Sequence, residues 1–278
     1  MPGSLIYYQD SKGGGFAVGI VNEIYEFQYF DEDAMKFLAN MVNQGRLLRK
    51  KTNDGKDTDS IVKLDLHNNK LTPYDIKYLI EFDLKNLQYL NLSSNSIKPI
   101  GAVYLSRGDF RSLKHLMLNS SEIGDQGLNE LTNGSFTQLV DLYLCENSIS
   151  SQGIEYLVKA DFVKKLMLLD LSLNLDIKDL GIKIMKEHKV WDNLTALGLD
   201  ATNLTDLGLK YLSQASMKKL RKLSIMGNNF TAKGKTIING LRMNHISVVY
   251  KTKEEREKEK REKEKREKEK RKKEGKNK

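Results

Sequence analysis

The stretch from Leu139 to Ile149 reads Leu-Val-Asp-Leu-Tyr-Leu-Cys-Glu-Asn-Ser-Ile, and its spacing of leucines decides the fold. The same Leu-x-x-Leu-x-Leu pattern starts at Ile61, Leu87, Leu113, Leu139, Leu166, Leu194 and Leu220. We expect a degenerate eighth start at Ile246. The seven full starts follow one another at intervals of 26 to 28 residues. A spacing this regular indicates an internal repeat.

Other residues keep the same register behind each leucine pattern. Eight residues after the start, five of the seven units carry asparagine, while Ser121 and Thr202 take its place in the other two. The asparagines are Asn69, Asn95, Asn147, Asn174 and Asn228. Six units then carry a glycine, at Gly101, Gly127, Gly153, Gly181, Gly208 and Gly234. A buried amide can satisfy backbone groups where a strand ends, so the asparagine column is predicted to be structural.

Each unit contains two hydrophobic periods. The alternation Leu142/Leu144 has the period of two that is expected of a short strand with one buried face. After Gly153, the pair Ile154/Leu157 has the spacing of one face of a helix. We therefore expect a strand, a turn and a helix in each unit, with the glycine just before the helix. One unit cannot bury its apolar side alone, but stacked units form a continuous core.

The units resemble leucine-rich repeats, and their length with a single glycine before a full helix is most similar to the ribonuclease-inhibitor-like subfamily. The resemblance covers residues 60–250. It implies an α/β solenoid shaped as a right-handed horseshoe, with parallel strands on the concave side and helices on the convex side. It also implies that a protein partner binds on the concave face.

Two segments flank this repeat domain. Residues 1–59 are predicted to be an N-terminal cap segment, with strands at Leu5 to Tyr8 and Phe16 to Val21 around a Gly-rich turn. Apolar residues from Asp31 towards Leu48 have a helical spacing. A separate small binding module is the alternative for this segment.

Residues 251–278 form a charged, low-complexity tail that is expected to be a single solvated helix or disordered. The whole chain of 278 residues holds 46 Lys plus Arg, and 16 of them lie in this tail, beside 9 of the 37 acidic residues. The basic balance thus belongs mainly to the tail. Its most basic run is Lys270, Arg271, Lys272 and Lys273. Contact with nucleic acid or an acidic membrane is therefore possible through the tail only, although alternating glutamates weaken that hypothesis.

Repeat register predicts which side chains share the concave face, namely those at the third, fifth and seventh positions of each unit. The third-position row runs Lys63, Tyr89, His115, Asp141, Leu168, Ala196 and Lys222. The fifth runs Asp65, Asn91, Met117, Tyr143, Asp170, Gly198 and Ser224, and the seventh includes Cys145. Aromatic and methionine side chains in a polar frame are typical of interface hot spots. The predicted partner-binding residues are Tyr89, Asn91, His115, Met117, Asp141, Tyr143 and Asp170.

No catalytic constellation emerges from the same register. Strand geometry places Cys145 about 14 Å from His115, too far for a nucleophilic pair. Asp141 and Asp170 are expected roughly 8 Å apart, but on an open face with no apolar pocket to raise the pKa of either carboxyl group. No Cys/His cluster has metal-ligand spacing. We therefore expect no enzyme activity, no cofactor and no metal.

The favoured hypothesis is a monomeric, non-enzymatic scaffold that binds a protein partner on its concave face. Two alternatives are association of the tail with nucleic acid or an acidic membrane, and regulation or inhibition of a partner enzyme. A single cysteine and the lack of an evident leader or apolar span favour an intracellular, cytoplasmic location, with the nucleus or delivery into a host cell left open.

Overall fold

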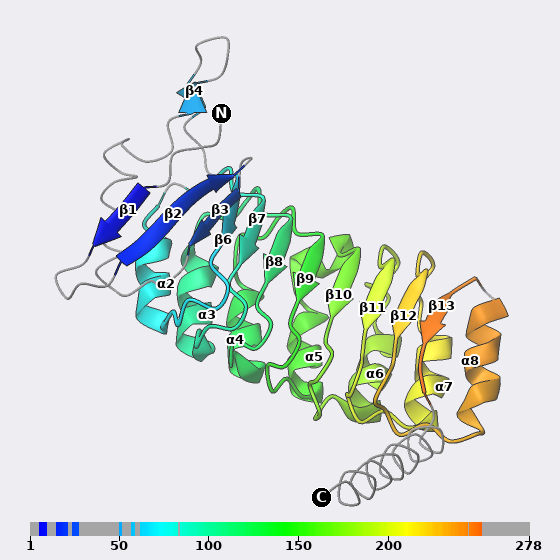
Figure 1. Cartoon of the computed structure of the whole chain (residues 1–278). Helices are drawn as coiled ribbons and strands as arrows, with labels where there is room; N and C mark the ends of the chain where they lie inside the picture. Colours follow the sequence, from blue (N-terminus) through cyan, green and yellow to red (C-terminus); the bar gives the residue numbers. More distant parts are fainter. Residues whose placement is uncertain are drawn as a thin grey trace, which may run out of the picture.

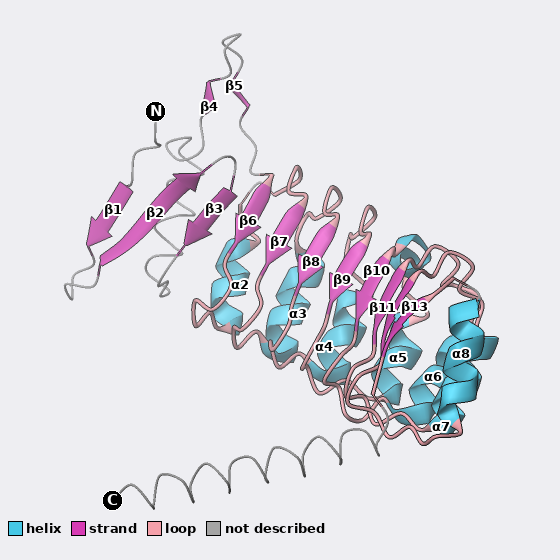
Figure 2. Cartoon of the chain, turned by 45° about the vertical axis from the view of Figure 1, so that its right-hand side comes forward, coloured by secondary structure: helices cyan, strands magenta, loops and turns pink. Residues whose placement is uncertain are grey.

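The structure is a computed structural model that describes residues 6–9, 15–21, 24–27, 50–51, 57–58, 62–82, 84–243 and 245–251. From residue 62 onwards, strands and helices alternate along an open, elongated solenoid (Figure 1). The strands form one side of the solenoid and the helices the other (Figure 2). The predicted α/β leucine-rich-repeat architecture is confirmed.

The repeat strands are short and lie in sequence order within one sheet. Their bounds are β6 Lys63–Asp65, β7 Tyr89–Asn91, β8 His115–Met117, β9 Asp141–Tyr143, β10 Leu168–Asp170, β11 Ala196–Gly198, β12 Lys222–Ser224 and β13 Ser247–Val249. Each pairs in parallel with the next, so Leu90 stands opposite Leu64 on one side and Leu116 on the other. Equivalent residues of successive units therefore form straight rows, as the repeat register predicts.

Helices follow the strands and cover the other face of the sheet (Figure 1). They are α2 Pro73–Leu79, α3 Lys98–Arg107, α4 Gly124–Leu131, α5 Ser151–Leu157, α6 Lys178–Glu187, α7 Asp206–Gln214 and α8 Gly234–Met243, with a 3-10 helix η1 at Asp161–Lys165. The repeated tyrosines Tyr78, Tyr104, Tyr156 and Tyr211 are half-buried on these helices, as expected of side chains that pack against the core.

The core lies between the sheet and the helices. In every strand from β6 to β12 the middle residue is a buried leucine, and its two neighbours are more exposed. The leucine two residues after Leu142, Leu144, is also buried, and Ile154 and Leu157 of α5 meet the strands from the helix side. Complete burial of one such side chain stabilises the fold by about 1.5–3 kcal/mol. The concave face is thus left to the residues on either side of each buried leucine.

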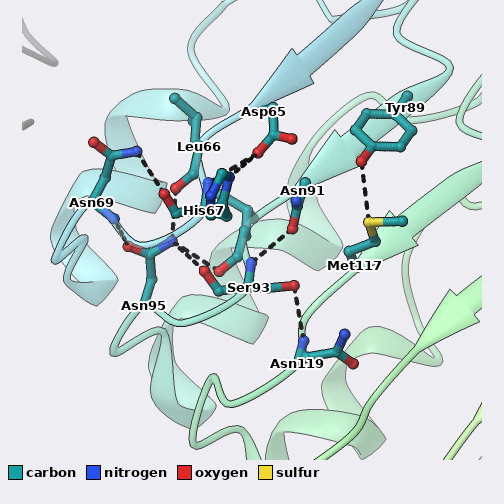
Figure 3. A network of polar contacts seen from close by, with 11 residues as sticks. Asp65, Leu66, His67, Asn69, Tyr89, Asn91, Ser93, Asn95, Met117 and Asn119 are labelled. Atoms are coloured by element: carbon teal, nitrogen blue, oxygen red, sulfur yellow. Dashed lines mark hydrogen bonds and ion pairs between the residues drawn. The ribbon is translucent and has the colours of Figure 1, made fainter. Parts of the chain in front are cut away.

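The asparagine column forms a ladder between successive units (Figure 3). The Oδ1 atom of Asn95 accepts hydrogen bonds from the backbone N–H groups of Asn69 and Leu71, both at 2.9 Å. Its Nδ2 group donates to the carbonyl groups of Leu66 and Leu92, both at 2.9 Å. The side chain therefore completes the turn of the preceding unit as well as its own. The predicted structural role is confirmed.

The helices begin earlier than the sequence pattern indicates. The repeat glycine was expected just before each helix, but in five of six units it lies inside, as Gly127 does in α4. A Cβ atom at Gly127 would lie 2.9 Å from the Cβ of Ile123 and 3.2 Å from the Cα of Pro99 in α3. The glycine is therefore needed because neighbouring helices approach closely there.

Three strands continue the sheet beyond β6. Strands β1 Ile6–Gln9 and β2 Gly15–Val21 pair antiparallel, which matches the two strands predicted in this region. Strand β3 Ile24–Phe27, which the sequence did not indicate, pairs antiparallel with β2 and parallel with β6. Strands β4 Lys50–Lys51 and β5 Asp57–Thr58 pair antiparallel in a second sheet. The helix expected from Asp31 towards Leu48 lies outside the described residues.

The eighth unit starts one residue earlier than expected. Strand β13 places Val248 opposite Leu223, so the residue equivalent to Leu220 is His245 and not Ile246. Burial explains the shift, because Val248 is 5% exposed and Val249 is 53% exposed. The tail residues Lys270, Arg271, Lys272 and Lys273 lie outside the described residues. Among the residues that are described, no helix is long and apolar enough to cross a membrane.

Candidate functional site

All seven predicted partner-binding residues lie in two adjacent rows of the concave face. Tyr89, His115 and Asp141 stand opposite one another on β7, β8 and β9. Asn91, Met117, Tyr143 and Asp170 form the second row, on β7 to β10. Every one of them is half-buried, because it flanks a buried leucine. The strand register thus places the seven residues that were grouped from the sequence next to one another on the same face.

The third-position row is joined by contacts between side chains. The Nζ atom of Lys63 lies 4.4 Å from the centre of the Tyr89 ring, a cation–π distance. The rings of Tyr89 and His115 are 6.3 Å apart. His115 in turn contacts Asp141, with 2.6 Å between Nδ1 and Oδ2. The pair was not predicted, because His115 was considered only as a partner of Cys145. The shared row position of His115 and Asp141 is the sequence signal for it.

The two rows are also connected to each other. The Tyr89 hydroxyl group donates to the sulfur of Met117 at 3.2 Å, a contact that joins β7 to β8 (Figure 3). In the same picture, Oδ1 of Asn91 accepts from the backbone N–H of Ser93 at 3.1 Å. Local partners therefore hold Tyr89, Met117 and Asn91 in defined orientations before any ligand arrives.

Carboxylate groups set the electrostatics beside the rows. Burial, followed by the charges of Asp141 and Asp170, raises the pKa of the Tyr143 hydroxyl group. Burial, followed by the charges of Asp170, Glu146 and Asp200, raises the pKa of Cys145 to about 11. The thiol is therefore protonated at neutral pH, and the Nδ1 atom of His115 is engaged by Asp141. A thiolate nucleophile is not formed here.

A hollow of about 320 Å³ lies on the concave face over β10 to β13. Leu168, Ala196 and Val249 supply apolar wall, while Tyr143, Asp170 and Lys222 are among its other lining residues. This hollow was not predicted from the sequence. The hollow forms because Ala196 and Gly198, in the third- and fifth-position rows, are small residues on β11 between larger ones on β10 and β12. Two small residues in adjacent rows are the signal that was overlooked.

Within the described ranges, no group of three or more His, Cys, Asp or Glu side chains is arranged to hold a metal ion. The concave face thus offers aromatic, apolar and carboxylate groups for recognition. It arranges them over parallel strands that lie side by side, with the two predicted rows at its centre and the hollow towards β13.

Comparison with known proteins gives the class of the fold. A family model described as leucine-rich repeat matches residues 83–106. No curated protein sequence matches the chain. The matches indicate no enzyme family. Together with the strand register, the matching unit makes the chain a leucine-rich-repeat solenoid.

The chain is also similar to solved structures that include a human protein and proteins of Listeria monocytogenes. Human 5T4 (Wnt-activated inhibitory factor 1, trophoblast glycoprotein) is 21% identical, with 71% of this chain and 72% of that chain covered and a TM-score of 0.46. An internalin-like protein of Listeria monocytogenes is 17% identical, with 75% and 66% covered and a TM-score of 0.42. An internalin of the same bacterium, InlF, is 17% identical, with 80% and 70% covered and a TM-score of 0.40.

Proposed function

We propose that the chain is a non-enzymatic interaction scaffold that binds a protein partner through the central patch of its concave face. The central patch consists of Tyr89, Asn91, His115, Met117, Asp141, Tyr143 and Asp170. Solenoids of this kind present extended concave surfaces and use them for binding. The leucine-rich-repeat fold is in general a scaffold for contacts between proteins.

One observation carries the proposal: two rows of aromatic, methionine and polar side chains that are already held in place. Tyr89 contacts Met117 in the other row, and His115 contacts Asp141 on the next strand. Tyrosine and methionine are enriched in the cores of protein interfaces, and hot spots cluster near the interface centre. Because the orientations are fixed beforehand, less side-chain entropy is lost on binding.

Affinity capture with the full chain tests this function. The wild-type chain is compared with a Tyr89→Ala, Tyr143→Ala variant, and bound proteins are quantified by mass spectrometry. Tyr74→Ala is the matched control, since Tyr74 is 62% exposed and lies on α2, away from the concave face. We expect the double variant to lose the partner and the control to retain it. Equal recovery of the same partners by all three chains would refute the central patch as the binding site.

Finer assignments belong to the same proposal. Units of 26 to 28 residues with one helix each support the ribonuclease-inhibitor-like type of repeat. Residues 1–59 serve as the cap of the first unit, which the pairing of β3 with β6 supports. The chain acts as a monomer in an intracellular setting, and its single cysteine is compatible with that setting.

Association of the tail with nucleic acid or an acidic membrane is the competing function. It predicts binding that falls steeply with salt and is lost when residues 251–278 are removed, because it depends on the charges of the tail. Capture through the central patch should survive the same truncation. Regulation of a partner enzyme is the other alternative, and no residue of the chain is assigned to it.

A further inference from the structure

The hollow over β10 to β13 arises because two residues of β11 are small. Ala196 lies between Leu168 and Lys222 in the third-position row, and Gly198 lies between Asp170 and Ser224 in the fifth. Strand β11 therefore forms the floor of a trough whose walls are the side chains of β10 and β12. The trough is part of the rigid sheet, so its shape does not depend on a loop.

Asp170 extends over this floor. A Cβ atom at Gly198 would collide with Oδ1 of Asp170 and lie 2.9 Å from its Cγ. The same Oδ1 accepts the backbone N–H of Ser172 at 3.0 Å, which orients the carboxylate group. Glycine at position 198 is thus required for Asp170 to reach into the hollow. The arrangement places an oriented negative charge beside the apolar surface formed by Leu168 on the wall and Ala196 on the floor.

The charges on this side of the concave face are not neutralised. In the part of the chain that the structure describes, no Lys, Arg or His side chain forms an ion pair with Asp170 or Asp200. Burial is the largest cause of the raised pKa of Cys145, and the charges of Asp170, Glu146 and Asp200 raise it further. These charges give this side of the concave face a negative potential. Lys222 lies on the opposite wall, two strands across and two residues along from Asp170, so the two backbones are about 12 Å apart, and Lys222 is exposed to water.

We propose that the hollow seats a basic side chain, arginine or lysine, of the protein partner, with its aliphatic stem against Leu168 and Ala196 and its cationic group on Asp170. Long basic side chains bury their stems on apolar surface and keep the charge at a polar edge. Tyr143, which also lines the hollow, offers an aromatic ring to the same cation. The inference deepens the proposed function and rests on it, since it names the chemistry of the partner at one end of the same face.

Methyl NMR on the full chain tests this inference directly. The chain is labelled at alanine and leucine methyl groups and titrated with N-acetyl-arginine N-methylamide. The uncharged citrulline analogue, of nearly the same shape, is the first control. We expect saturable shifts at Ala196 and Leu168 with the arginine compound, and binding about threefold to tenfold weaker with citrulline, because the charged hydrogen bond to Asp170 is lost.

Two variants and a matched control complete the test. Asp170→Asn should weaken arginine binding about threefold to tenfold and leave citrulline binding unchanged. Ala196→Phe, which removes the methyl reporter at position 196, should abolish the shift at Leu168 by filling the hollow. Asp176→Asn, at a carboxylate that is 67% exposed and paired with Lys178 at 2.7 Å, should bind arginine as the wild type does.

Several results would overturn the inference. They are an absence of shifts at Ala196 and Leu168, equal binding of arginine and citrulline, preferred binding of N-acetyl-glutamate N-methylamide, or undiminished binding by Ala196→Phe. These outcomes need no partner, so they are separate from the capture experiment. Loss of the partner by the Tyr89→Ala, Tyr143→Ala variant without arginine binding would leave the proposed function standing and remove this inference alone.

Discussion

The Nδ1 atom of His115 lies 2.6 Å from Oδ2 of Asp141 on the neighbouring strand. The side chains are 39% and 22% exposed, so the pair belongs to the surface and not to the core. It ends a row of contacts that begins with Lys63 and passes through Tyr89. The pair therefore orients the central patch more than it stabilises the fold.

A double-mutant cycle with His115→Ala and Asp141→Ala is expected to give a coupling energy below about 1 kcal/mol, because water reaches both side chains and weakens the polar contact between them. Urea denaturation of the two single variants, the double variant and the wild type measures it. A coupling energy above about 2 kcal/mol would show that the pair is a stabilising element of the sheet.

Asn147→Ala should be strongly destabilising. Its Oδ1 accepts from the backbone N–H groups of Ser121 and Ile123 at 3.1 and 3.2 Å, and its Nδ2 donates to the carbonyl group of Leu118 at 2.6 Å. Each buried backbone group left without a partner costs about 1–3 kcal/mol. The free energy of unfolding in urea should fall by about 3 kcal/mol or more, whereas Asn133→Ala, at an exposed position, should change it by less than about 0.5 kcal/mol.

Gly127→Ala and Gly240→Ala should have opposite effects. At Gly127 an added Cβ would press on Ile123 and on the backbone of Pro99, so we expect a loss of about 1–3 kcal/mol from overpacking. At Gly240, in α8, an added Cβ meets nothing within 4 Å, and the better helix propensity of alanine should add about 0.5–1 kcal/mol. Thermal unfolding of both variants checks the two signs. Similar melting temperatures for the two would contradict the close helix approach at Gly127.

Cys145 should be slow to alkylate. Burial and three carboxylates raise the pKa of its thiol from 9.0 to about 11, so at pH 8 the thiolate fraction falls about 100-fold below that of an ordinary cysteine. Iodoacetamide labelling followed by mass spectrometry measures the rate, with the urea-unfolded chain as the reference. Equal rates in the folded and unfolded chains would contradict the raised pKa.

The raised pKa also fixes the sign of a stability change. The folded chain holds the Cys145 proton more tightly than the unfolded chain, so this contribution to stability is complete below pH 9 and is lost as the pH rises towards 11. The raised pKa of the Tyr143 hydroxyl group acts in the same direction. Unfolding in urea at a series of alkaline pH values should show the decline.

The sequence alone was sufficient for the architecture, since the leucine period places Leu64, Leu90 and Leu116 on adjoining strands. Side-chain rows follow from the same period. The His115–Asp141 contact was accessible from the register but was overlooked, because histidine was weighed only as a partner of cysteine. The eighth start was misplaced by one residue because Val248 and Val249 are both valine, and only burial distinguishes the two registers.

The hollow was overlooked, although the small residues Ala196 and Gly198 in adjacent rows indicate it. The candidate residues were chosen for the chemical groups that they carry, and these two positions carry only a methyl group and a hydrogen atom. The negative charge beside the hollow also depends on the orientation of the Asp170 carboxylate group. The space left by Gly198 and the hydrogen bond from the backbone N–H of Ser172 determine that orientation. Orientation of that kind follows from packing in three dimensions and not from spacing along the chain.

The asparagine ladder imposes an order on the folding of the repeat units. Asn95 caps the turn of the unit before it, through acceptors and donors 24 to 29 residues earlier, and Asn174 does the same for a carbonyl group 30 residues earlier. When the chain leaves the ribosome, the turns capped in this way therefore find their last backbone partners only after the following unit has emerged.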